Sequence, residues 1–412
     1  MHLTTLSLLD FRNVVEATVV FDPEGTTLVT GPNGAGKTNL LEAVAYAATL
    51  RSFRGAPREA MVRHGQERAV VRAETKVGPR DLTVEAELAV AGRSRALLNR
   101  QPVRRRSDLH EALRCTVFSP QDIVIVRGGP ADRRAFLDET LEAVDPKAAR
   151  ELEELERVLR QRGALLRDAY RRSPGEVERS LDVWDQRLEE TGTRVVEARE
   201  QLVEQLQPRV AALYDDLAGR RFDVRLRYAR SWEGALSAGL AAHRQVDLAR
   251  GVTTVGPHRD ELELTVAGLP ARTQTSQGEQ RSLALALRLA GHRLATERLG
   301  EPPLLLLDDV FSELDDGRRR ALVAALPAGQ ALVTSAVPAP PDVAVARVVE
   351  VGPGGRIGRA EVQAEAPAEA PPEAQADEPA EAGGDGKEAE GDGKEAEGDG
   401  KEAEGDGKEA PR

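Results

Sequence analysis

The stretch of sequence that decides the fold of this chain is Gly31-Pro32-Asn33-Gly34-Ala35-Gly36-Lys37-Thr38. Its pattern, GxxxxGK followed by a hydroxyl residue, is that of a Walker A phosphate-binding loop. Residues 27–30 before it have the composition of a β-strand, and residues 38–50 after it have that of a helix. A strand, a glycine-rich loop and a helix in this order predict an α/β fold that holds a nucleotide at the start of the helix.

The residues of this octet have distinct expected roles in binding ATP and Mg²⁺. Glycines let the backbone curl so that several N–H groups face one anion, and the helix N-terminus adds positive charge. Lys37 is expected to reach the β- and γ-phosphates and to act in catalysis, and the Thr38 hydroxyl is expected to ligate Mg²⁺. We therefore expect every residue from Gly31 to Thr38 to contact ATP.

An acidic pair follows an apolar run near the other end of the chain, at Leu304-Leu305-Leu306-Leu307-Asp308-Asp309. Four leucines predict a buried strand, and the pair then lies at its carboxyl end, where α/β sheets bind their ligands. Asp308 is expected to hold Mg²⁺ directly or through water, and Asp309 to orient or deprotonate the attacking water. This pattern is typical of a Walker B strand.

A third motif comprises Ser276, Gln277, Gly278 and Glu279, before a helix expected at residues 281–299. It resembles the signature loop of ABC and SMC ATPases. In that class the loop closes on the γ-phosphate held by another protomer, which implies an ATP-dependent homodimer. An ordinary helix N-cap is the alternative interpretation of Ser276. The segment Ser312-Glu313-Leu314-Asp315 resembles the D-loop, which also crosses such interfaces, with Ser312 and Asp315 as candidates.

A helical segment separates the two sets of motifs. Apolar positions alternate at steps of four and three residues, as in a coiled-coil seam with one polar member, along Val177, Leu181, Trp184, Leu188, Thr191, Val195, Ala198 and Leu202. We expect a short antiparallel helical arm at 131–220, between an N-terminal ATPase lobe at 1–130 and a C-terminal lobe at 221–360. A helical bundle packed on the body is the alternative.

The last part of the chain, residues 361–412, carries most of the acidity. It has 18 acidic and 5 basic side chains. Because the whole chain has a net charge of −12, residues 1–360 are nearly neutral, with 52 basic and 51 acidic side chains. The tail ends in three copies of Gly-Asp-Gly-Lys-Glu-Ala-Glu, at 384–390, 391–397 and 398–404. A repeat without large apolar residues is expected to be disordered. The acidity therefore does not argue against nucleic-acid binding by the body.

Composition also indicates the cellular compartment in which the protein is expected. The single cysteine, Cys115, cannot form a disulfide framework, and no apolar run approaches the roughly 18–20 residues that span a bilayer. The chain opens on a strand-like pattern and not on a secretory signal. We expect a cytoplasmic protein that is not embedded in a membrane, although attachment to a membrane subunit stays open.

Several further segments make the resemblance specific to the RecF family. They are 6–13 (LSLLDFRN), 51–54 (RSFR), 128–138 (GGPADRRAFLD), 159–162 (LRQR), 256–262 (GPHRDEL) and 308–315 (DDVFSELD). The likeness covers about residues 1–350. It implies an ABC/SMC-type ATPase head split by a helical arm. It also implies an ATP-dependent dimer on gapped DNA and single-strand/double-strand junctions, which works with RecO and RecR to load RecA. An ATPase subunit of another machine, a transporter or an SMC-like complex, is the alternative.

The sequence departs from transporters at two points of the expected site. Asp309 replaces the usual glutamate, and its shorter side chain predicts slow hydrolysis. The strand at 331–335 lacks the switch histidine, and Thr334 is the candidate replacement for its γ-phosphate contact. Gln121 is the candidate Q-loop glutamine, and His258 either lines the nucleotide site or makes a structural hydrogen bond.

Arginines supply the candidate DNA contacts, because the guanidinium group pairs with phosphate without reading a base. The candidates are Arg51, Arg54, Arg58, Arg104, Arg105 and Arg106. The alternative interpretation is an ordinary solvated surface, and for Arg54 it is a contact with the nucleotide.

Overall fold

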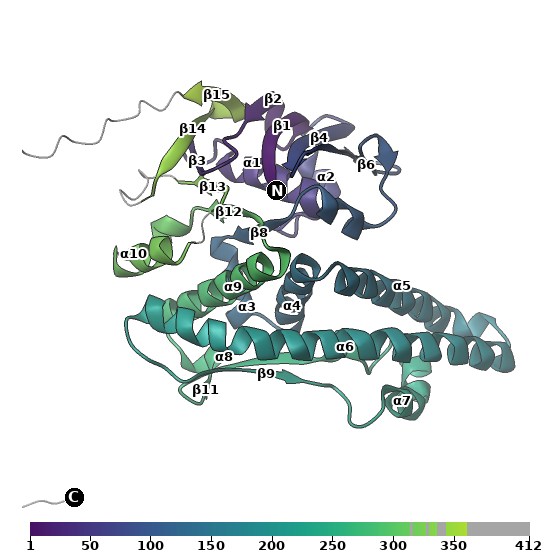
Figure 1. The fold of residues 1–412 in the computed structure, drawn as a ribbon. Coiled ribbons are helices and arrows are strands. Elements are labelled where there is room, and N and C mark those ends of the chain that lie inside the picture. The colour runs from purple at the N-terminus through teal and green to yellow at the C-terminus, as the bar shows by residue number, and fades with distance from the viewer. Residues whose placement is uncertain (314–315, 327–328, 336–342, 361–412) are drawn as a thin grey trace, which may run out of the picture. The chain divides into compact units, whose positions relative to one another are not determined.

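A six-stranded, largely parallel sheet is the centre of the fold. The computed structural model describes residues 1–313, 316–326, 329–335 and 343–360 (Figure 1). The strand order is β15-β14-β3-β13-β12-β8, and only β15 is antiparallel to its neighbour. The strands are β3 (Thr26–Thr30), β8 (Cys115–Phe118), β12 (Leu304–Asp308), β13 (Ala331–Thr334), β14 (Val345–Gly352) and β15 (Arg356–Ala360).

The four leucines of β12 show why this sheet is buried on both faces. Successive side chains of a strand point to opposite faces. Leu305 and Leu307 belong to one hydrophobic core, whereas Leu304 and Leu306 belong to a second. Helix α1 (Lys37–Thr49) contributes to the second core and α9 (Gln277–Leu299) to the first, so the two helices cover opposite faces of the sheet.

A second sheet, antiparallel, covers the outer side of α1. Its order is β2-β1-β4-β5-β6-β7. Its strands are β1 (His2–Phe11), β2 (Val14–Val20), β4 (Arg68–Val77), β5 (Arg80–Ala89), β6 (Arg95–Leu98) and β7 (Gln101–Pro102), with α2 (Arg58–Met61) nearby. Because α1 contacts strands of both sheets, nearly all of its side chains are buried. Its alanines allow this close approach.

The helical part begins after β8. The helices are α3 (Ile123–Arg127), α4 (Pro130–Val144), α5 (Pro146–Asp168) and α6 (Pro174–Ala218). A short connection around Ser173 joins α5 to α6, and the two lie side by side as an antiparallel pair (Figure 1). The eight expected seam positions are all buried or partly buried on α6. The same helix also packs along α9 and β9 (Val224–Ala229).

The remaining described elements complete the C-terminal half. They are α7 (Leu236–Arg250), β10 (Glu261–Val266), β11 (Leu269–Pro270), α8 (Ala271–Gln274) and α10 (Asp316–Ala325). Strands β11, β10 and β9 form a small antiparallel sheet. Short 3₁₀ turns are η1 (Arg106–Glu111), η2 (Pro120–Asp122), η3 (Ala169–Arg171), η4 (Pro257–Arg259), η5 (Val310–Glu313) and η6 (Pro353–Gly355).

Several expectations from sequence can now be compared with the structure. The strand at 304–308 is confirmed, and the helix expected at 281–299 begins four residues earlier because a capping box starts it at Ser276. The division into lobes and arm at 130, 220 and 360 stays a prediction, and the tail from 361 lies outside the described residues. Within the described part of the chain, no helix is long and apolar enough to cross a membrane.

Candidate nucleotide-binding site

The loop between β3 and α1 requires glycine at two positions. Gly31 has φ 143°, and a Cβ there would lie 2.1 Å from the carbonyl oxygen of Val351 in β14. Gly36, the N-cap of α1, has φ 118°, and its Cβ would lie 2.7 Å from Oδ1 of Asn13. Other residues are strained in this region of φ. The octet is therefore shaped by its neighbours β14 and the β1–β2 turn as much as by its own sequence.

The Lys37 ammonium group lies against the backbone of this loop. Its Nζ donates to the carbonyl oxygens of Gly31, at 2.8 Å, and Pro32, at 3.3 Å. The residue is buried, and its position in the first turn of α1 is fixed by the helix. A charge held in the loop at a helix N-terminus is the arrangement that binds phosphate groups.

Three elements meet at the carboxylate of Asp308. Its Oδ1 accepts hydrogen bonds from Thr38 Oγ1 of α1, at 2.8 Å, and from Thr334 Oγ1 of β13, at 2.9 Å. Burial raises the pKa of Asp308 above its ordinary value, and the two hydroxyl donors and the nearby Arg54 counteract that increase. Hydroxyl and carboxylate oxygens side by side are the donor set that suits Mg²⁺. The two residues expected to hold the metal are thus together.

Asp309 has an unusual backbone conformation. Its φ is 49°, in the left-handed region that costs a residue other than glycine roughly 1–3 kcal/mol. Its N–H donates to the hydroxyl of Thr334, at 2.9 Å, and to the carbonyl oxygen of the same residue, at 3.2 Å. Thr334 therefore contacts both acidic residues: its hydroxyl donates to the Asp308 carboxylate, and its hydroxyl and carbonyl oxygens accept from the N–H of Asp309.

A group of residues behind the loop was not predicted from sequence. Asn13 donates from Nδ2 to the carbonyl oxygen of Ala35, at 2.7 Å, and accepts from Nδ2 of Asn39, at 2.8 Å. Arg12 forms a bidentate ion pair with the fully buried Glu42 of α1. Segment 6–13 indicates a family resemblance and no role at the loop, because no local pattern in the sequence relates residue 13 to residue 35.

Arg54 belongs to this same neighbourhood. Its Nη1 donates to Oδ1 of Asn39, at 3.3 Å, and lies 4.0 Å from Oε2 of Glu42. Its charge also counteracts the burial that raises the pKa of Asp308. Asn39 directly follows Thr38. This placement favours the nucleotide alternative for Arg54 over a DNA contact.

Gln121 lies at the same edge of the sheet as the acidic pair. It is in η2, directly beyond β8, whose Phe118 pairs with Leu307 of β12. Its side chain is exposed. The structure thus places Gln121 near the carboxyl end of β12, and its contact with nucleotide stays a prediction.

The signature turn lies at the surface on the start of α9. Ser276 is the N-cap: its Oγ accepts from the N–H of Glu279, at 3.3 Å, and its own N–H donates to Oε2 of Glu279, at 2.8 Å. Ser276 and Gln277 are exposed, and Gly278 is partly buried next to Arg318. The N-cap interpretation is therefore correct, and the role of the turn as a signature loop stays a prediction. Of the D-loop candidates, Ser312 is in η5 and Asp315 lies outside the described residues.

His258 lies in η4 and makes a structural hydrogen bond. Its Nε2 is 3.0 Å from the carbonyl oxygen of Thr253, and burial lowers its pKa to about 4. It lines a cavity of about 310 Å³ next to α4 and α5, together with Arg51. These contacts favour the structural alternative.

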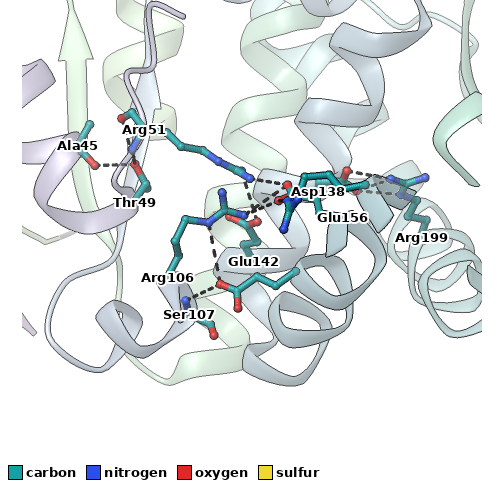
Figure 2. A network of polar contacts seen from close by, with 11 residues as sticks. Ala45, Thr49, Arg51, Arg106, Ser107, Asp138, Glu142, Glu156 and Arg199 are labelled. Carbon is teal, nitrogen blue, oxygen red and sulfur yellow. Dashed lines mark hydrogen bonds and ion pairs between the residues drawn. The ribbon is translucent and has the colours of Figure 1, made fainter. Parts of the chain in front are cut away.

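Two DNA candidates are engaged by carboxylates of the helical part. Arg51 contacts Glu142 of α4 and Glu156 of α5, and Arg106 contacts Glu153 and Glu156 of α5 (Figure 2). The structure brings these two arginines together from positions that are far apart in sequence.

The other DNA candidates are placed differently. Arg58 is exposed, and its Nη1 donates to the hydroxyl of Ser94, at 2.9 Å. Arg104 and Arg105 are exposed just before η1. Their DNA contacts stay predictions.

Comparison with known proteins identifies the family. The model of the RecF/RecN/SMC N terminal domain matches residues 2–337. A DNA replication and repair protein RecF from Frankia alni is 47% identical over 358 residues, covering 82% of this chain and 94% of the relative. The chain belongs to the RecF family. The RecF protein of Kineococcus radiotolerans is 42% identical, with 82% of this chain and 93% of that protein covered.

Solved structures agree with the family. The recombination mediator protein RecF with ATP, of the RecFOR pathway, superposes with a TM-score of 0.78 at 27% identity, covering 87% of this chain and 98% of that one. An SMC head bound to the C-winged helix domain of ScpA has a TM-score of 0.53 at 14% identity, which supports the fold alone. The expected ABC/SMC-type head fold is confirmed.

Proposed function

We propose that this RecF-family chain is an Mg²⁺-dependent ATPase of DNA repair and replication. The observation that carries the proposal is the 2.8 Å hydrogen bond between Thr38 and Asp308, which joins the Walker A and Walker B residues. A solved structure of the recombination mediator protein RecF with ATP supports ATP as the ligand. Residues 31–38 would bind the triphosphate, with Lys37 at the β- and γ-phosphates.

The roles of the acidic residues follow from their positions. Thr38 and Asp308 would hold Mg²⁺, which supplies charge neutralisation on the triphosphate when it is bound. Asp309 would orient or deprotonate the attacking water. Its side chain is one methylene shorter than glutamate, and hydrolysis is therefore slow. Thr334 keeps Asp308 in place, and Gln121 completes the site from the β8 side.

ATP would also join two copies of the chain. The exposed turn of Ser276, Gln277, Gly278 and Glu279 is accessible to the γ-phosphate of a partner, and the N-terminus of α9 adds a favourable charge. Ser312 would lie at the same interface. Hydrolysis then resets the dimer.

The DNA substrate and the partner proteins of this ATP-dependent dimer are proposed from the family. A clamp formed on gapped DNA or a single-strand/double-strand junction in the cytoplasm would act with RecO and RecR and, indirectly, with RecA. Relatives named as replication and repair proteins and as a mediator of the RecFOR pathway support this over a transporter or SMC-like subunit.

The test is ATP turnover and sedimentation with and without gapped duplex. The wild-type chain should dimerise with ATP, and gapped DNA should stimulate its turnover. Ser276→Arg should bind ATP but stay monomeric, whereas the control Ser237→Arg, at another exposed helix start, should dimerise normally. A wild-type chain that stays monomeric at saturating ATP would contradict the proposal.

A further inference from the structure

One carboxylate, that of Glu156, collects arginines from three places in the chain. Arg51 Nη2 is 2.7 Å from its Oε1, Arg106 Nη2 is 3.2 Å from its Oε2, and Arg160 Nη1 is 3.8 Å from its Oε2. Figure 2 shows Arg51 and Arg106 reaching Glu156 from the side opposite to Arg199. An oxyanion that accepts from several guanidinium groups is the geometry of a phosphate site.

Backbone hydrogen bonds fix the chain at both arginines, independently of Glu156. The N–H of Arg51 donates to the hydroxyl of Thr49, at 3.2 Å, and that hydroxyl donates to the carbonyl oxygen of Ala45 within α1. Arg106 begins η1, and the next N–H, of Ser107, donates to Glu153, at 3.0 Å. Arg51 is thus attached to the end of the helix that starts at the proposed ATP site.

The contacts on Glu156 are open to solvent. The exposed side-chain fractions are 39% for Arg51, 30% for Arg106 and 44% for Glu156. In contrast, the neighbouring Arg199 is almost fully buried in a bidentate pair with Asp138. Exposed ion pairs contribute little to stability. Glu156 can therefore be displaced by a competing anion, whereas the Arg199–Asp138 pair is structural.

The cavity beside this cluster provides room for the exchange. Its volume is about 310 Å³, and its lining includes Arg51, Glu142, Glu156 and Arg134. Glu156 lines this space, and three further carboxylates, of Asp138, Glu139 and Glu142, lie in the same wall. The motifs at 51–54, 128–138, 159–162 and 256–262 all contribute to its wall.

We propose that Arg51 and Arg106 form a binding site for a DNA backbone phosphate, and that Glu156 closes this site in the present conformation. DNA must displace Glu156, the carboxylate that both arginines share, whereas Glu142 contacts Arg51 alone and Glu153 contacts Arg106 alone. This proposal rests on the proposed DNA-binding function and extends it, because it names Glu156 as the residue that limits the access of DNA to the two arginines. Its link to α1 couples the exchange to the nucleotide site.

The experiment compares the full chain with Glu156→Gln, which keeps the shape but removes the competing charge. Binding of a fluorescent gapped duplex with ATP and Mg²⁺ should tighten about two- to fivefold, the worth of one exposed ion pair. Glu154→Gln is the matched control: it lies on the same helix and pairs with Arg157 instead. It should leave affinity unchanged.

A second variant should have the opposite effect on DNA affinity. Arg106→Gln should weaken binding and lower the slope of log affinity against log salt by about one. Unchanged or weaker binding by a folded Glu156→Gln chain, while wild type binds DNA, overturns the inference alone. A wild-type chain that binds no DNA overturns the proposed function as well.

The same assay distinguishes a DNA backbone phosphate from free inorganic phosphate as the ligand of this site. Replacing chloride with inorganic phosphate at equal ionic strength should preserve the gain of Glu156→Gln. If inorganic phosphate abolishes that gain, the site takes a small anion and not the DNA backbone, and the proposal fails.

Discussion

At the scale of single residues, Thr334 positions the two acidic residues of the site. Its hydroxyl donates to Asp308 and accepts from the N–H of Asp309. The sequence made this residue a candidate only because a histidine was missing at 331–335. Its actual contacts depend on the parallel pairing of β12 with β13, in which Asp308 is opposite Thr334. No local pattern reveals that register.

The first prediction concerns this hydroxyl. Thr334→Val keeps the volume but removes both hydrogen bonds, so kcat for ATP should fall by about tenfold or more while KM changes little. The free energy of unfolding should fall by about 1–2 kcal/mol. Steady-state turnover and urea unfolding measure the two effects. Thr75→Val, at a buried threonine of β4, is the control that should keep normal turnover.

Buried histidines make stability depend on pH at the same scale. Burial lowers the pKa of His110, His258 and His292 to about 4. The unfolded chain takes up protons at the ordinary pKa of 6.5, and the folded chain does so only near 4. Their contribution is therefore present above about pH 6.5 and is lost as pH falls toward 4.

The second prediction isolates one of these histidines. The difference in free energy of unfolding between wild type and His258→Gln should shrink as pH falls from 7 to about 4.5, by roughly 1–3 kcal/mol. Urea unfolding at a series of pH values gives this difference. A difference between wild type and His258→Gln that stays constant from pH 7 to about 4.5 would contradict the lowered pKa of buried His258.

At the scale of elements, Arg162 ties three helices together. It is fully buried in α5, and it donates to Asp185 of α6, at 2.7 Å, and to Asp247 of α7, at 2.8 Å. In the sequence this arginine is one of many in a charged helix. The coiled-coil seam of α6 could be recognised from its period, whereas α7 and the buried network depend on how the helices pack.

The third prediction follows from that burial. Arg162→Met removes the buried guanidinium group from Asp247 and from Asp185, of which Asp185 keeps its ion pair with Arg244. The free energy of unfolding should fall by about 3–5 kcal/mol, because the Asp247 carboxylate stays buried without that charge. Arg157→Met, at an exposed pair on the same helix, should leave the free energy of unfolding nearly unchanged. Denaturant unfolding of the two variants compares them directly. Equal losses would show that Arg162 is not the link between these helices.

Other elements differ in how well their sequence specified them. The strand β12 was predictable because four leucines are buried on both faces of a parallel sheet. Strand β8 was not, since Cys115-Thr116-Val117-Phe118 is too short to show a period and is stabilised by pairing with β12. The start of α9 was placed too late because the capping box at Ser276 begins the helix.

At the scale of the whole molecule, segments distant in sequence build one site. The Walker A loop, Walker B strand and β13 come from opposite ends of the described chain, and their order was predictable from motifs with fixed spacing. The polar cluster around Glu156 was not predictable, because Arg51 and Arg106 reach it only through the tertiary packing of α5 on η1. Motifs specify the chemistry of the phosphate loop, and packing specifies what surrounds it.

The most direct measurement of the central claim is the Mg²⁺ dependence of ATP affinity. Titration calorimetry of the wild-type chain should show ATP binding at least about tenfold tighter with Mg²⁺ than with EDTA. Asp308→Asn should bind ATP with nearly the same affinity in both conditions, because its side chain no longer supplies the carboxylate next to Thr38. If Asp308→Asn retains the full gain from Mg²⁺, Thr38 and Asp308 do not form the metal site, and the account is wrong.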